Sequence, residues 1–239
     1  KTTQSICQHE LPKYTITHAI EDKNVLKFHI DYFKGDGTIN LKPGDTIAQQ
    51  AVAETIIDKH NAATSQRKFN AVLATASINN AIEYYRLFKE LQKKKQTNDP
   101  QYVPLNITAV FSPPAQLIAK EGDQQSQKNA ADSNQIQEDL VNEKEDNKKK
   151  RKEKKKALIE IIEDYNQQFG TNHDINNFDI YYQDVQRRIK DQKFSNKDYP
   201  HKNKIDITIV VDMLLTGFDS KFLNTLYVDK NLKFHGLIQ

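Results

Sequence analysis

The feature that most constrains this chain is the alternation of short apolar runs with longer amphipathic segments. Apolar runs of strand length lie at residues 69–75, 107–111, 205–213 and 223–229. The first, Phe69-Asn-Ala-Val-Leu-Ala-Thr75, has the pattern of a strand that is buried on both faces. Each intervening segment is long enough for a crossover connection. The pattern therefore predicts βαβ units and an α/β fold with a parallel sheet.

Helical periodicity marks several of the segments between these runs. One helix is expected from Asp45, a suitable N-cap, to about residue 62, and another from Ser77 through Leu91. Two more are expected in residues 158–169 and 178–192, where apolar residues recur at three- and four-residue spacing.

The domain organisation follows from changes in composition. Residues 1–45 are expected to form a linker with one half-buried strand at 25–32, and residues 46–239 the main domain. Residues 120–156 are mostly Gln, Asn, Asp, Glu and Lys. Such a segment cannot bury enough apolar area to offset its ordering entropy, so it is predicted to be a polar, lysine-rich surface insertion that leads into a helix.

The net charge of +3 is concentrated in one segment. Residues 144–156 carry nine basic and three acidic side chains, so the rest of the chain has a net charge of −3. The protein is therefore not expected to coat nucleic acid through bulk positive charge. The basic run itself has two interpretations, a solvated surface or a nucleic-acid contact.

Cysteine usage and hydropathy predict a cytoplasmic protein without a membrane partner. The single thiol, Cys7, excludes an internal disulfide and fits a reducing compartment. No apolar run approaches the roughly 18–20 residues that a membrane helix needs, and no export leader is visible at Lys1.

The sequence lacks the motifs of several common enzyme classes. There is no G-x-x-x-x-G-K-[S/T] phosphate loop, no G-x-S-x-G nucleophile motif and no H-E-x-x-H zinc motif. The seven His residues lie apart, without a pair at ligand spacing. We expect neither a metal site nor a catalytic residue within these 239 residues.

Ligands of open parallel sheets gather at the carboxyl ends of the strands, which directs attention to residues 75–77, 111–112 and 212–219. In the last segment, Thr216 offers a hydroxyl, Gly217 allows close approach of a ligand to the backbone, and Asp219 offers a carboxylate. Backbone N–H groups there could hold a phosphate, and the carboxylate a sugar hydroxyl. The alternative is a simple turn followed by a helix cap. Ser77 likewise predicts either an anion site or an ordinary N-cap.

Residues 205–239 resemble the motor (R) subunit of type I restriction–modification enzymes, through Ile-Asp-Ile-Thr-Ile-Val-Val-Asp-Met-Leu-Leu-Thr-Gly-Phe-Asp at 205–219 and the residues that follow. Residues 18–32, 68–88 and 107–112 agree with this resemblance in the same order. Within that family the chain resembles the second RecA-like domain of a superfamily 2 DNA translocase. The resemblance implies a three-layer α/β fold with a mostly parallel sheet and helices on both faces.

The resemblance also implies roles for particular residues. Leu214-Leu-Thr-Gly-Phe-Asp219 is similar to helicase motif V, residues 69–77 are similar to motif IV, and Gln239 matches the first residue of motif VI. Two groups follow, with Gly217, Asp219 and Gln239 at a nucleotide interface, and Thr75, Ser77, Ser112 and Thr216 against the DNA backbone.

For the full-length subunit the resemblance implies ATP and Mg²⁺ as cofactors. The partners that it implies are double-stranded DNA and the modification and specificity subunits. The motif VI arginines, the first RecA-like domain and the nuclease domain have no counterpart in this sequence. We therefore expect a fragment that binds no cofactor and has neither ATPase nor nuclease activity on its own. The alternatives are another superfamily 2 motor, of the type III restriction or repair class, and a non-enzymatic module that docks nucleic acid or a partner protein.

Overall fold

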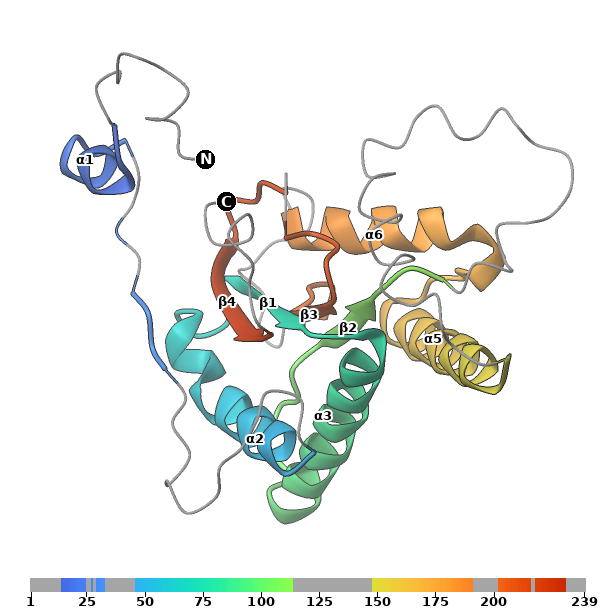
Figure 1. Ribbon diagram of the computed structural model, residues 1–239. Helices are drawn as coiled ribbons and strands as arrows, with labels where there is room; N and C mark the ends of the chain where they lie inside the picture. Colours follow the sequence, from blue (N-terminus) through green and yellow to red (C-terminus); the bar gives the residue numbers. More distant parts are fainter. Residues whose placement is uncertain are drawn as a thin grey trace, which may run out of the picture. The chain divides into compact units, whose positions relative to one another are not determined.

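The computed structural model describes residues 14–24, 27, 29–32, 46–113, 148–190, 202–215 and 218–230. The chain divides into two units, Lys1–Thr38 and Ile39–Gln239. In chain order the elements are α1 (Ile16–Glu21), α2 (Thr46–Ala63), β1 (Asn70–Thr75), α3 (Ile78–Asn98), β2 (Ile107–Val110), α5 (Lys148–Phe169), η4 (Ile175–Asn177), α6 (Phe178–Lys190), β3 (Ile207–Val210) and β4 (Leu223–Asp229) (Figure 1).

The four strands form one parallel sheet with the order β2-β3-β1-β4, which confirms the predicted sheet. β1 lies in the middle and pairs Leu73 with Ile209 of β3 on one side and with Tyr227 of β4 on the other. The central strands β1 and β3 are buried along their whole length, as their continuous apolar sequence requires. The edge strand β4 alternates between half-buried and exposed residues, because one of its faces is uncovered.

Helices cover both faces of the sheet, as in the RecA-like α/β fold. On one face α3 contacts β1, β2 and β3, and α2 packs beside α3. On the other face α6 places Tyr181 against β2, where its hydroxyl lies 2.8 Å from Thr108 Oγ1 and donates to the Ala109 carbonyl at 2.9 Å. Figure 1 shows α2 and α3 on one side of the sheet and α6 on the other.

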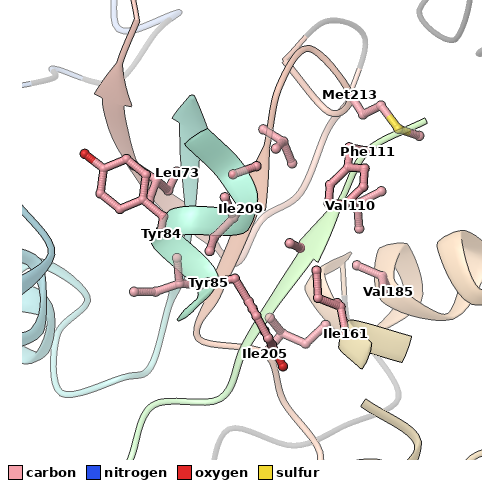
Figure 2. Packing of buried hydrophobic residues seen from close by; sticks show 14 of the residues in the cluster. Leu73, Tyr84, Tyr85, Val110, Phe111, Ile161, Val185, Ile205, Ile209 and Met213 are labelled. Carbon is pink, nitrogen blue, oxygen red and sulfur yellow. The ribbon is translucent and has the colours of Figure 1, made fainter. Parts of the chain in front are cut away.

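A single hydrophobic cluster joins these layers. It combines Leu73 of β1 and Ile209 of β3 with Tyr85 of α3, Ile161 of α5 and Val185 of α6, all less than a tenth exposed (Figure 2). Burial of large apolar side chains from every layer is the main stabilising contribution to such a fold. Among the described residues, no helix is both long and apolar enough to cross a membrane.

The amino ends of the strands are held by a buried ion pair. Arg67 donates from Nε to Asp206 Oδ1 at 2.9 Å and from Nη2 to Oδ2 at 2.5 Å, and both side chains are 2% exposed. The remaining Arg67 donors reach the carbonyls of Val103 and Pro104. Arg67 ends a turn in which Ser65, Gln66 and Arg67 all have positive φ angles. This turn directs the Arg67 guanidinium towards the amino ends of the strands.

The structure differs from the sequence prediction in the N-terminal unit. Residues 27 and 29–32, which belong to the predicted strand at 25–32, are not in a strand, and Ile30 and Tyr32 are 58% and 78% exposed. Alternating hydrophobicity is insufficient here because no described strand pairs with this segment. Instead a short helix that the pattern did not predict, α1, is capped by Thr15, which accepts from the His18 N–H.

The basic run also has a structure that its composition did not indicate. α5 begins at Lys148, ten residues before the first apolar residue of the predicted helix, so the run up to Lys156 is helical. Lys154 and Ala157 are buried, at 4% and 3% exposed, because they lie on the face of α5 that packs against the domain. The other expected helices and strands agree with the structure to within a few residues, apart from α3, which continues to Asn98, and β3, which spans only Ile207–Val210.

Candidate functional site

The carboxyl edge of the sheet brings one predicted group to a helix N-terminus. β1 ends at Thr75, and α3 begins three residues later, at Ile78, behind the N-cap Ser77. The Ser77 hydroxyl accepts from the Asn80 N–H at 3.2 Å and lies 2.5 Å from Asn80 Oδ1. The side chain is half-buried, and the free N–H groups of the first helical turn lie beside it. Ser77 is therefore an N-cap whose surroundings also suit an anion.

Thr75 and Ser112 occupy strand ends but are buried. Thr75 is 0% exposed, and its hydroxyl donates to the Val210 carbonyl of β3 at 3.0 Å. Ser112, two residues beyond β2, is 2% exposed. In this structure Thr75 ties the ends of β1 and β3 together. A DNA contact by either residue stays a prediction.

The end of β3 is held by the lysine that directly follows β4. Lys230 donates from Nζ to the Val211 carbonyl at 2.7 Å and forms an ion pair with Asp212. Both acceptors directly follow β3, so one cation fixes the start of the connection between β3 and β4. Two residues later Leu214 has a φ of +65°. A buried leucine in this left-handed conformation is strained, and such strain persists only where its surroundings enforce it.

A tyrosine from α3 secures the end of β4. The Tyr84 hydroxyl donates to Asp229 Oδ2 at 2.7 Å. Burial, followed by this hydrogen bond to a carboxylate, raises the pKa of Tyr84 far above its ordinary value, so the phenol stays protonated. Tyr84, Asp229 and Lys230 were not singled out from the sequence. The sequence did offer a signal, because Asp229 ends a predicted strand and Lys230 directly follows it.

Asp219 lies at the opposite end of the strands from Ser77. The neighbouring residue Ser220 donates to the Ile189 carbonyl at 3.0 Å, and Asn70, the first residue of β1, donates to the same carbonyl at 2.9 Å. β1 runs roughly 16 Å from Asn70 to Thr75. The expectation that the whole segment 212–219 lies at the carboxyl edge is therefore wrong for Asp219, because the chain has already returned to begin β4.

The remaining predicted site residues cannot be placed. Thr216, Gly217 and Gln239 lie outside the described residues. Asp219 is exposed and has no ion-pair or hydrogen-bond partner in the described part of the chain. Within that same part, no three His, Cys, Asp or Glu side chains are grouped so that they could hold a metal ion.

Among the described residues, this arrangement offers groups that can bind and position a ligand. At the carboxyl edge it presents a helix N-terminus and a short segment held by Lys230. Among the described residues, the predicted nucleotide group is represented by Asp219. The predicted DNA group is represented by Thr75, Ser77 and Ser112, which follow the carboxyl ends of β1 and β2.

Comparison with known protein families shows which family this chain belongs to. The family model for "Type I restriction enzyme subunit R domain 3" matches residues 67–239, which include all four strands of the sheet. The chain belongs to the type I restriction enzyme subunit R family. This confirms the resemblance drawn from residues 205–239 and the earlier stretches.

Curated relatives in this family align with the whole chain. The type I restriction enzyme SauCOLORF180P endonuclease subunit of Staphylococcus aureus strain COL is 32% identical over 255 residues. The SsaAORF53P endonuclease subunit of Staphylococcus saprophyticus is 34% identical over 257 residues. Each alignment covers 100% of this chain and 23% of the relative, so the R-subunit chain spans about a quarter of their length.

Proposed function

We propose that this chain forms part of the ATP-dependent DNA translocase of a type I restriction endonuclease, with DNA-backbone contacts at the carboxyl edge of its sheet. The family match carries this proposal. The RecA-like arrangement supports it, since Ser77 and the N-terminus of α3 form a site that suits a phosphate. Contacts of this kind position a protein on a duplex without reading its sequence. Sequence recognition would then belong to the specificity subunit, and methylation to the modification subunit.

The residues present suit one side of an ATP site. Asp219 is an exposed carboxylate that could accept from a ribose hydroxyl, with Gly217 and Gln239 as the other proposed nucleotide-interface residues. The described residues hold no carboxylate cluster for Mg²⁺, so we assign the metal and phosphate ligands to other parts of the full-length subunit. When bound, ATP would supply the free energy of phosphoryl transfer. This chain alone should have neither ATPase nor nuclease activity, and we place the complex in the cytoplasm.

DNA-stimulated ATP hydrolysis by the full-length protein tests the proposal. We expect duplex DNA to accelerate ATP hydrolysis by the wild type, and we expect residues 1–239 alone to show no turnover. Thr216→Ala and Asp219→Ala should abolish DNA translocation in a triplex-displacement assay while the circular dichroism spectrum stays unchanged. Normal stepping by both variants would refute the assignment.

The family match argues against the two alternatives, another superfamily 2 motor and a non-enzymatic docking module. The docking module predicts that the full-length protein binds DNA without hydrolysing ATP. The same ATPase measurement therefore separates it from the translocase.

A further inference from the structure

The first turns of α5 carry an exposed row of lysines that the site at the sheet edge does not use. Lys149, Lys152 and Lys156 are all exposed, and their spacing of three and four residues places them on one side of the helix. We call these three residues the basic stripe. None of the three has an ion-pair or hydrogen-bond partner among the described residues.

The local electrostatics of this helix are unfavourable without a partner. No acidic residue lies in the first turn of α5, where the helix dipole favours negative charge. Lys152 follows Lys149 by three residues and precedes Lys156 by four, so these like charges repel one another. A polyanion bound along the stripe would relieve both effects.

The acidic half of the same helix is paired within the protein. Asp164 accepts from the Tyr85 hydroxyl at 2.8 Å and pairs with Lys89 Nζ at 2.5 Å, and Glu160 lies 3.7 Å from the same ammonium group. The charge of α5 is therefore mostly segregated, with Glu153 as the one acidic residue among its lysine-rich first turns. Its later turns bind α3, whereas its first turns present cations to the surroundings.

These contacts also fix the place of α5 in the domain. Tyr85 and Lys89 of α3 meet Asp164 and Glu160 of α5, while Gln92 and Gln168, further along both helices, line one cavity of about 200 Å³. α5 therefore crosses α3 near Lys89, and these contacts hold the middle of α5 against the domain. Lys152 precedes Glu160 by eight residues, or about 12 Å of helix, so the basic stripe lies on the N-terminal side of the contact with α3. Figure 1 shows this N-terminal end of α5, in yellow, on the side where β2 ends.

We propose that the basic stripe is a second contact for the phosphate backbone of duplex DNA, in addition to the contact at Ser77. Charge complementarity selects this partner, since a duplex carries one negative charge per about 1.7 Å of its axis and suits unpaired lysines on one helix face. This inference rests on the proposed function, because it takes the DNA from that assignment.

The test measures how DNA affinity depends on salt in the full-length protein. Lys149→Gln, Lys152→Gln and Lys156→Gln are combined in one variant. The matched control combines Lys59→Gln, Lys93→Gln and Lys202→Gln, which remove the same charge from exposed positions near the amino edge. Binding of a fluorescent 30-base-pair duplex is followed by anisotropy over a series of salt concentrations. Substitution leaves the helix intact, whereas deletion of the run would also remove buried Lys154.

We expect the stripe variant to lose at least tenfold in affinity near 0.1 M salt, and its slope of log K against log salt to fall by about two to three. The control should retain the wild-type slope, and a triple Lys→Arg variant of the stripe should retain affinity. The melting temperature of the stripe variant should equal or exceed that of the wild type, because repulsion is removed.

An unchanged slope in the stripe variant would overturn the inference, as would an equal loss in the control, which would indicate bulk charge alone. Retained DNA binding with lost association to the modification and specificity subunits would assign the stripe to a protein partner instead, and would also overturn it. The ATPase measurement is independent. A wild type without DNA-stimulated hydrolysis would remove the motor assignment, whereas the slopes would still decide whether the stripe contacts DNA.

Discussion

At the scale of single residues, the ion pair between Arg67 and Asp206 is the polar contact on which the amino ends of the strands most depend. Arg67 connects the turn before β1 to β3 and to the segment before β2 through Pro104. Asp206 also accepts from the Asn106 N–H at 2.7 Å. Every strand except β4 is thus tied to one buried guanidinium and its carboxylate.

Removal of one partner should leave the other charge buried and unpaired. We expect Arg67→Met to lower the free energy of unfolding by about 3–5 kcal/mol, measured by urea denaturation. The control Lys94→Met, which removes an exposed ion pair with Glu90, should leave the midpoint unchanged within error. Equal stability of the two variants would contradict the assigned role of the buried pair.

His60 should make stability depend on pH. It is a residue of α2 that is fully buried against β4, its Nδ1 lies 3.3 Å from the Tyr227 hydroxyl, and its Nε2 has no hydrogen-bond partner among the described residues. Burial lowers the pKa of His60 from 6.5 to about 4, although the nearby Asp206 opposes this effect. The folded state therefore holds the imidazole neutral in the range where the unfolded chain would protonate it.

The direction of this pH dependence follows from the linkage between protonation of His60 and folding. The contribution of His60 to stability is complete above pH 6.5, and it falls as the pH decreases from 6.5 to about 4, by roughly 3 kcal/mol in total. Urea denaturation between pH 7.5 and 4 should show this loss in the wild type and a smaller loss in His60→Gln. His29→Gln, at an exposed position, should follow the wild type. Parallel pH profiles for the wild type and His60→Gln would show that His60 is not responsible.

At the scale of elements, the connection between β3 and β4 is short and is held at both ends. Lys230 fixes its start at Val211 and Asp212, and Ser220 fixes its end at Ile189 of α6. Between these points lies the strained Leu214 and then the predicted motif V residues. Restraint at both ends is what a loop needs if it is to present a ligand-binding segment in one conformation.

Lys230→Met should loosen this connection without unfolding the sheet. We expect amide hydrogen exchange of residues 211–215 to accelerate about tenfold or more, because one cation supplies contacts to both Val211 and Asp212. Lys221→Met, at an exposed position near the other end of the connection, should leave exchange of residues 211–215 unchanged. Equal exchange rates of residues 211–215 in the two variants would contradict this role of Lys230.

At the scale of the whole molecule, the distance between Ser77 and Asp219 predicts separable effects. In the full-length protein Ser77→Gly should weaken DNA binding and leave the KM for ATP unchanged. Asp219→Asn should raise the KM for ATP and leave DNA affinity unchanged in the absence of nucleotide. The residues lie at opposite ends of β1, so the free-energy changes in the double variant should add within about 0.5 kcal/mol. Free-energy changes that depart strongly from additivity in the double variant would indicate that Ser77 and Asp219 share a single site.

Much of this architecture could be predicted from local sequence. The continuous apolar runs around Leu73 and Ile209 determined two buried strands, because only a strand covered on both faces has no polar side to present. The position of Ser77 determined the start of α3. The long, specific segment from Ile205 determined the family. The buried strands, the start of α3 and the family match all depend on residues that are close together in the chain. A sequence shows such local patterns directly.

Tertiary structure alone decided which residues lie together. Asp219 follows Asp212 by only seven residues, yet the return of the chain to begin β4 takes it to the other end of the sheet. Lys149 looked like part of a polar insertion, but packing of Lys154, Ala157 and the apolar residues after them extends α5 back through the lysines. Both outcomes depend on contacts between segments far apart in sequence, and local propensity carries no information about such contacts.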